Sequence, residues 1–192
     1  MIILVKQASE CSQHSICPCK GKENIGNFMD FLRPSFGEKI LLMGDVSYYG
    51  KYLKKAGADV TIFEHAENFN NSAVIKNSNC SIVDGLPEYM PFKDSCFDKV
   101  VFLNHFNSFD DEKKVLKEVD RVLKLHGDII IEEVNPKGII RKISIIFMKL
   151  LGFQCKYYAP CEILRLFKGL GYSGEINDVE NKKFIYVGKK LN

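Results

Sequence analysis

The stretch ILLMGDVSYYG, residues 40 to 50, decides the fold of this chain. Residues 39–43 form an apolar run with the composition of a parallel strand that is covered on both faces. The run stops at Gly44 and passes into a segment with helical character, residues 48–56. Free backbone N–H groups converge at such a strand-to-helix turn, and nucleotide-like ligands bind there in α/β proteins. We therefore expect a cofactor site at Gly44, although a cradling loop usually has two or three glycines.

Further apolar runs follow this first strand at regular intervals. A helix with a well-defined start separates two of them, because Asp110 and Asp111 are N-cap candidates before a run with helical apolar spacing. Strands that alternate with helices favour a parallel sheet with right-handed crossovers. The runs that we expect to be strands cover residues 60–63, 80–83, 97–103 and 129–131.

The alternation of strand and helix patterns ends after the fifth strand. An insert of about residues 135–171 contains two helical patterns, at residues 139–151 and 160–170. Residues 172–179 and 182–188 then alternate like strands, and a link this short requires an antiparallel hairpin. We expect one α/β domain over residues 24–192, with a mostly parallel seven-stranded sheet, helices on both faces and the hairpin at one edge.

The composition describes an ordinary globular protein. The 192 residues are 46% hydrophobic and 27% charged, which is enough apolar material for a substantial core. Lys and Arg number 27 against 24 Asp and Glu, so the net charge of +3 does not indicate a nucleic-acid partner. No run reaches transmembrane length. The apolar start of the sequence is too short for a signal peptide, and seven cysteines are an odd count. Both observations favour reduced thiols in the cytoplasm over a disulfide framework.

Residues 1–23 form an N-terminal arm with little periodicity, which contains the string ECSQHSICPCKG. Thiolates and an imidazole at this spacing could ligate zinc or a softer metal, whereas structural zinc sites usually draw on two separated pairs. The alternative is a flexible arm with reduced cysteines. The candidate metal ligands are Cys11, His14, Cys17 and Cys19. A short helix at residues 25–32, ended by Pro34, follows the arm.

Two strings in the second half of the chain resemble a known family. They are PFKDSCFDKVV, residues 91–101, and EVDRVLKLHGDIIIEE, residues 118–133. In this order and at this separation they resemble class I S-adenosylmethionine-dependent methyltransferases, of the small-molecule branch that includes the ubiquinone and menaquinone methyltransferases. With the strand order, the resemblance covers about residues 38–190. It implies a Rossmann-like doubly wound fold, with S-adenosylmethionine as the cofactor and a small-molecule acceptor.

The resemblance also implies roles for residues at the strand ends. Gly44 would lie against the cofactor. Glu64, at the end of the second strand, matches the acid that accepts from both ribose hydroxyls. Asp84 matches the acid that accepts from the adenine amino group, and Gly85 would let the backbone approach the ring.

The glycine loop departs from the family pattern. Leu42 replaces an acid, and Val46 and Tyr48 replace glycines. Asp45 or Ser47 could restore polar contacts to the methionine end of the cofactor. The sequence therefore leaves two functions open: methyl transfer, or a catalytically degenerate domain that binds a cofactor or partner. The hairpin and the missing glycines disfavour another nucleotide-binding protein such as a dehydrogenase.

The string LNHFNSF, after the fourth strand, contains the candidate catalytic residues. Methyl transfer needs mainly orientation, which can lower a barrier by about 7–11 kcal/mol. His105 would act as a base where the acceptor loses a proton, and Asn104 would orient the acceptor. The alternative for His105 is a loop residue that only forms hydrogen bonds. Apolar insert residues indicate an apolar or aromatic acceptor or ordinary packing: Ile143, Phe147, Phe153, Tyr157 and Tyr158. A homo-oligomer is compatible with the sequence.

Overall fold

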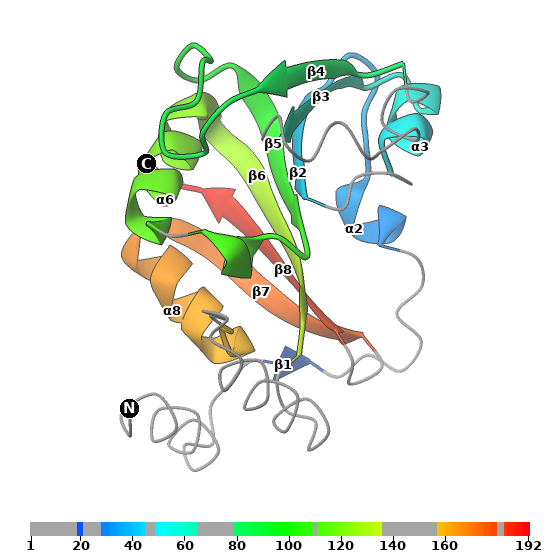
Figure 1. The fold of residues 1–192 in the computed structure, drawn as a ribbon. Coiled ribbons are helices and arrows are strands. Elements are labelled where there is room, and N and C mark those ends of the chain that lie inside the picture. Colours follow the sequence, from blue (N-terminus) through cyan, green and yellow to red (C-terminus); the bar gives the residue numbers. More distant parts are fainter. Residues whose placement is uncertain are drawn as a thin grey trace, which may run out of the picture.

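The computed structural model describes residues 19–20, 28–44, 49–64, 79–109, 111–135, 157–179 and 183–192. Within these residues, eight strands form one sheet with the order β1-β7-β8-β6-β5-β2-β3-β4 (Figure 1). The strands are β1 (Cys19–Lys20), β2 (Lys39–Gly44), β3 (Asp59–Glu64), β4 (Ser81–Asp84), β5 (Phe97–Leu103), β6 (Leu123–Val134), β7 (Tyr172–Val179) and β8 (Lys183–Lys190).

The seven predicted strands are confirmed as β2 to β8. The neighbours β6-β5-β2-β3-β4 pair in parallel, and β7 and β8 form the predicted antiparallel hairpin, with β8 next to β6. Strand β1 was not predicted, because two residues carry no periodicity; it pairs in parallel with the outer edge of β7. Strand β6 is longer than residues 129–131, because backbone pairing also includes the polar segment before them.

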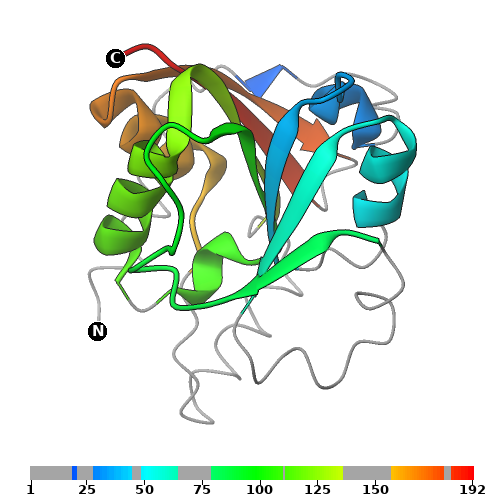
Figure 2. The ribbon, with the colours of Figure 1, turned by 90° about the horizontal axis from the view of Figure 1, so that it is seen from above.

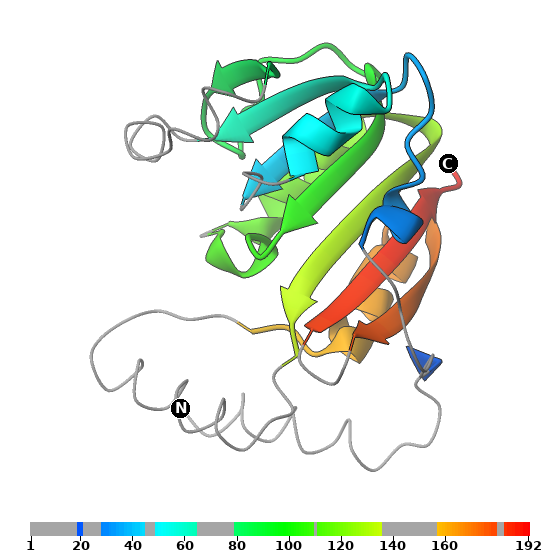
Figure 3. The same ribbon diagram turned by 90° about the vertical axis from the view of Figure 1, so that its right-hand side faces the viewer.

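Helices cover both faces of the sheet, as expected (Figure 2). On one face lie α6 (Glu112–Val122), α8 (Pro160–Gly169) and the short 3-10 helix η1 (Phe106–Ser108). On the other face lie α2 (Met29–Leu32) and α3 (Tyr49–Lys55), which Figure 3 shows in front of the strands. The helix predicted at residues 139–151 lies outside the described residues, as do residues 25–27 of the helix that precedes Pro34.

Alternating strand side chains build the two core layers. Leu41 and Met43 of β2 pack toward α6 and α8, whereas Ile40 and Leu42 pack toward α2 and α3. All four are essentially inaccessible to solvent, as expected for a strand that is covered on both faces. Helix α6 begins at the predicted cap, where the Asp111 carboxylate accepts from the Lys114 backbone N–H at 3.2 Å.

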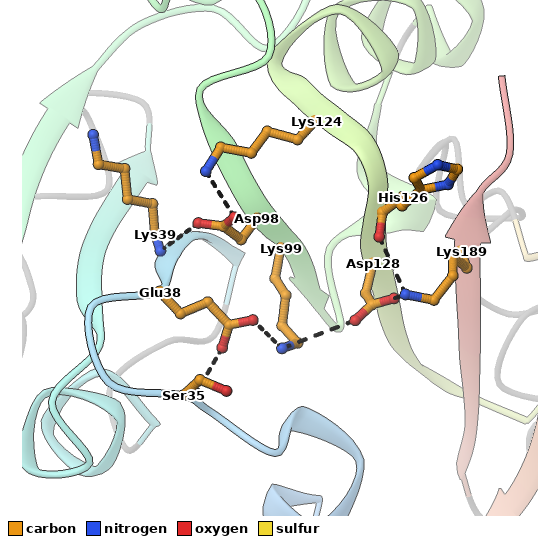
Figure 4. A network of polar contacts seen from close by, with 9 residues as sticks. All are labelled: Ser35, Glu38, Lys39, Asp98, Lys99, Lys124, His126, Asp128 and Lys189. Carbon is orange, nitrogen blue, oxygen red and sulfur yellow. Dashed lines mark hydrogen bonds and ion pairs between the residues drawn. The ribbon is translucent and has the colours of Figure 1, made fainter.

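The amino ends of β2, β5 and β6 are joined by charged side chains (Figure 4). Lys99 is the buried member, with its side chain 8% exposed. Its ammonium group donates to Glu38 and lies 3.9 Å from Asp128. Asp128 also pairs with Lys189 of β8 at 3.0 Å. One buried cation therefore connects the segment before β2 with β6 and, through Asp128, with β8.

A second carboxylate at this edge, Asp98, fixes the start of β2. It accepts from the Lys39 backbone N–H at 2.9 Å and from the Lys124 ammonium group at 2.7 Å. Partial burial raises the pKa of Asp98, but the hydrogen bonds from Lys124 and Lys39 outweigh this and leave it below the usual value. The ionised carboxylate thus holds β2 against β5 at the edge opposite the predicted cofactor site.

We predict that Lys99→Met lowers the free energy of unfolding by about 3 kcal/mol, because removing the buried cation leaves the partly buried carboxylate of Glu38 without its partner. Urea denaturation measures the change. The double variant Glu38→Gln/Lys99→Met is the matched control and should recover part of the loss, because it also removes the carboxylate charge. A loss below about 1 kcal/mol, the range of surface pairs, would contradict the assignment of Lys99 as the central cation.

Candidate functional site

The strand register places the predicted site residues along one edge of the sheet. Gly44 at the end of β2 lies opposite Leu103 at the end of β5, and Glu64 at the end of β3 lies opposite Asp84 at the end of β4. The chain leaves β5 directly into Asn104 and His105. Asp45 and Ser47 lie outside the described residues. This edge is the carboxyl edge of the parallel strands, where open α/β sheets bind their ligands.

Gly44 is the residue on which the close packing of this edge depends. Its φ of +95° is in the region that favours glycine. A Cβ at this position would lie 2.4 Å from the Leu103 carbonyl oxygen and 2.5 Å from the His105 Cβ. A side chain here would therefore force β2 and the His105 loop apart.

The two strand-end acids differ in exposure. Glu64 is 8% exposed, whereas Asp84, on the edge strand β4, is exposed. After Asp84 the chain passes over the Phe63 ring: a Cβ on Gly85 would lie 2.9 Å from two ring carbons. A glycine is thus required here by packing against an aromatic side chain.

His105 is half-buried and its ring orientation is set by Ser108. The single hydroxyl hydrogen of Ser108 is donated to the His105 carbonyl oxygen at 2.6 Å, and the same oxygen lies 3.2 Å from Nδ1. Nδ1 must therefore carry the proton of the neutral ring and donate it to Ser108. This leaves Nε2 as the nitrogen with the free lone pair, which is the tautomer that a base requires.

Two opposing effects act on the charge of His105. Burial lowers its pKa from the ordinary value of 6.5, and the negative charge of Glu64 raises it. The net effect is a lowered pKa, so the imidazole is neutral at physiological pH. The influence of Glu64 also shows that the predicted ribose acid and the predicted base share one electrostatic environment.

Asn104 is exposed and has a φ of +51°. Asparagine tolerates this left-handed conformation better than most residues. Its backbone N–H donates to the Glu132 carbonyl oxygen at 2.8 Å, which extends the pairing of β5 and β6 by one residue. Its side chain is therefore carried directly beyond the end of the sheet, beside His105.

Sequence reasoning missed a carboxylate and cation pair that holds the loop leading from Asp84 and Gly85 to β5. Arg121 of α6 forms two hydrogen bonds with Glu118, at 2.7 and 2.8 Å. The same guanidinium group donates to the carbonyl oxygens of Met90 and Phe92 and to Asp94, while Glu118 accepts from the Met90 backbone N–H. This pair holds the loop between β4 and β5. Both residues belong to the EVDRVLK string, but their backbone partners have no sequence signal.

The predicted metal ligands fall mostly outside the described residues. Cys11, His14 and Cys17 lie there, and Cys19 belongs to β1, where only the backbone is described. The described residues contain no cluster of three potential metal ligands. Among the cysteines, Cys80 and Cys96 are free, whereas Cys161 is disulfide-bonded, which departs from the expectation that all seven are reduced.

No helix in the described ranges is long and apolar enough to cross a membrane.

Comparison with known proteins agrees with this geometry. Residues 44–131 match the family described as "Methyltransferase domain". The demethylmenaquinone methyltransferase of Thermotoga maritima is 34% identical over 71 residues. That alignment covers 37% of this chain and 29% of the relative, so the similarity spans less than a third of the relative's length.

Solved structures extend the similarity to nearly the whole chain. A SAM-dependent methyltransferase from Methanosarcina mazei has a TM-score of 0.71 at 16% identity, covering 86% of this chain and 98% of its own. A possible histamine N-methyltransferase from Thermotoga maritima has a TM-score of 0.68 at 16% identity, covering 84% and 87%. At such identities the similarity shows the fold, and it confirms the predicted Rossmann-like architecture.

We predict that the pKa of His105 lies below 6.5 and that Glu64→Gln lowers it further, because the variant removes the negative charge that favours the imidazolium. The lowered pKa also makes the free energy of unfolding depend on pH. The unfolded chain binds the proton at higher pH than the folded chain, so stability falls as pH drops from about 6.5 to the folded pKa. His105→Asn should remove this contribution.

Titration of the imidazole signals by NMR checks the pKa values, and the nitrogen shifts report the tautomer. Asp84→Asn is the matched control, because Asp84 is not among the charges that influence His105. A pKa of 6.5 or higher in the wild type would contradict the buried, neutral assignment.

Proposed function

We propose that this chain is a class I S-adenosylmethionine-dependent methyltransferase domain, which binds S-adenosylmethionine at the carboxyl edge and methylates a small acceptor; the family match over residues 44–131 and the similar folds support this. The observation that carries the proposal is the convergence of Gly44, Glu64, Asp84 and His105 at the ends of adjacent parallel strands. These residues come from separate parts of the sequence and meet where the fold binds ligands.

The residues at this edge fit the chemistry of the cofactor. A nucleoside offers hydroxyl and amino hydrogens, which carboxylates accept with charge-assisted hydrogen bonds. We assign Glu64 to the ribose hydroxyls and Asp84, with the backbone at Gly85, to the adenine. Gly44, Asp45 and Ser47 would face the methionine end.

The bound cofactor would supply an activated methyl group on a sulfonium. The protein then needs to orient the acceptor and exclude water, and orientation is worth about 7–11 kcal/mol. We propose that Asn104 orients the acceptor and that Nε2 of His105 removes a proton from acceptors that lose one. The lowered pKa and the tautomer set by Ser108 support this role, because both keep the lone pair available.

We infer that the acceptor is a small apolar or aromatic molecule. Tyr157 and Tyr158 lead into α8 from the insert, and Tyr157 is 39% exposed. Aromatic side chains of this kind line sites for apolar ligands. The relative from Thermotoga maritima is named a demethylmenaquinone methyltransferase. The nearly balanced charge fits a small molecule in the cytoplasm better than nucleic acid.

S-adenosylmethionine and its demethylated product should raise the melting temperature. A ligand at a hundred times its Kd stabilises by about 2.7 kcal/mol, which corresponds to roughly 5–10 °C for a chain of this size. Differential scanning fluorimetry measures the shift. Absence of stabilisation at millimolar ligand would overturn the proposed function.

Calorimetric titration of variants tests the residue assignments. Glu64→Gln should weaken binding by roughly ten- to a hundredfold, because a hydrogen bond to a charged group contributes about 1.5–3 kcal/mol. Asp59→Asn is the matched control: it removes a carboxylate from the other end of β3, where Asp59 pairs with Lys54. Equal weakening by both variants would remove the assignment of Glu64.

A further inference from the structure

Glu133, at the carboxyl end of β6, is a buried carboxylate that faces N–H donors. It is 2% exposed. Its Oε1 accepts from the backbone N–H groups of Phe106 and Asn107 at 2.7 and 3.4 Å, and its Oε2 accepts from Asn107 Nδ2 at 2.6 Å. Burial raises the pKa of Glu133, and the donated hydrogen bonds oppose that rise. Both oxygens thus act as acceptors for the loop that follows His105.

Asn107 transmits this arrangement to another part of the chain. Its Nδ2 donates to Glu133, and its Oδ1 accepts from the Tyr158 backbone N–H at 3.3 Å. A backbone N–H can only donate and a carboxylate can only accept, so the two partners together permit one orientation of the amide. Turning the amide over would place donor against donor at Tyr158 and acceptor against acceptor at Glu133.

Tyr158 is held at two further points. Its ring packs edge-to-face on Phe106, with centroids 5.5 Å apart. Burial, the charge of Glu112 and a hydrogen bond to Glu112 at the start of α6 raise the pKa of the Tyr158 hydroxyl to about 12. Tyr158 lies two residues before α8, and its contact with Phe106 places it next to η1. The insert is therefore attached to the His105 loop at Tyr158.

We propose that Glu133 is a positioning residue: by fixing the amide of Asn107 it fixes the position of the segment at Tyr158 relative to the loop that carries His105. The inference rests on the proposed function in one respect, since it takes Tyr158 and His105 to border the acceptor. The hydrogen bonds that join Glu133, Asn107 and Tyr158, which we call the relay, rest only on the contacts above.

The chemistry of the relay predicts which substitutions break it. Glu133→Gln can still accept from Phe106, but its new NH2 group faces the NH2 group of Asn107. Asn107→Asp places a second carboxylate against Glu133. The double variant Glu133→Gln/Asn107→Asp exchanges the two groups: the amide at position 133 donates to the carboxylate at position 107, which still accepts from Tyr158. Every donor again has an acceptor.

The test is amide hydrogen exchange at Phe106 and Tyr158, measured by NMR in the protein without ligand. Each single variant should exchange roughly tenfold faster at Tyr158, because losing the charge-assisted hydrogen bond between positions 107 and 133 releases the side chain that accepts from the Tyr158 N–H. The double variant should return to within about threefold of the wild type. The His105 pKa should rise toward 6.5 in Glu133→Gln, because a displaced loop exposes the ring, and fall back in the double variant.

Glu132→Gln is the matched control. In the described part of the chain the Glu132 carboxylate accepts from Lys183 at 2.6 Å and forms none of the hydrogen bonds that join Glu133, Asn107 and Tyr158; only its charge acts on Glu133, where it raises the pKa. This variant should therefore leave Tyr158 exchange and the His105 pKa unchanged. Additive acceleration in the double variant, or an unchanged Tyr158 in Glu133→Gln, would overturn the proposal. Titration of the wild type with S-adenosylmethionine tests the proposed function separately, because the relay is measured without ligand.

Discussion

The parallel register of β4, β3, β2 and β5 is the constraint on which the rest of the structure depends. Hydrogen bonds between neighbouring strands fix a row that contains Asp84, Glu64, Gly44 and Leu103. Because parallel strands all finish at the same edge, side chains from distant parts of the chain meet there without a dedicated contact between them. The row tolerates no side chain at Gly44, where β2 and the His105 loop touch.

Much of the fold was readable from the sequence because strand ends and helix starts have local causes. The apolar runs located β2 to β6, the short link predicted the β7 and β8 hairpin, and Asp111 marked the start of α6. The same strand ends located Gly44, Glu64, Asp84 and His105 on one edge. Where prediction fell short, as in β1 and the polar start of β6, the pairing is made by backbone groups that leave no side-chain pattern.

The supporting contacts of the site could not be predicted for a related reason. Glu133 and Arg121 act on backbone N–H and carbonyl groups that are far away in sequence, and backbone groups are the same in every residue. In the sequence, two adjacent acids, Glu132 and Glu133, follow the apolar run of residues 129–131. In the structure both are buried, and strand alternation gives them different partners: Glu132 accepts from Lys183, whereas Glu133 accepts from the backbone of η1. Only the tertiary arrangement distinguishes them.

The two edges of the sheet both carry carboxylates, but these carboxylates differ in their surroundings. At the amino edge, Glu38, Asp98 and Asp128 each form an ion pair with a lysine of the same chain, so these carboxylates already have charged partners. At the carboxyl edge, the exposed Asp84 faces solvent, and the relay through Asn107 reaches the insert. A substitution at an exposed position of the carboxyl edge, such as Asp84, can therefore change the local charge while the lysine and carboxylate pairs at the amino edge stay intact. The two ends of the same strands are to that extent independent of each other.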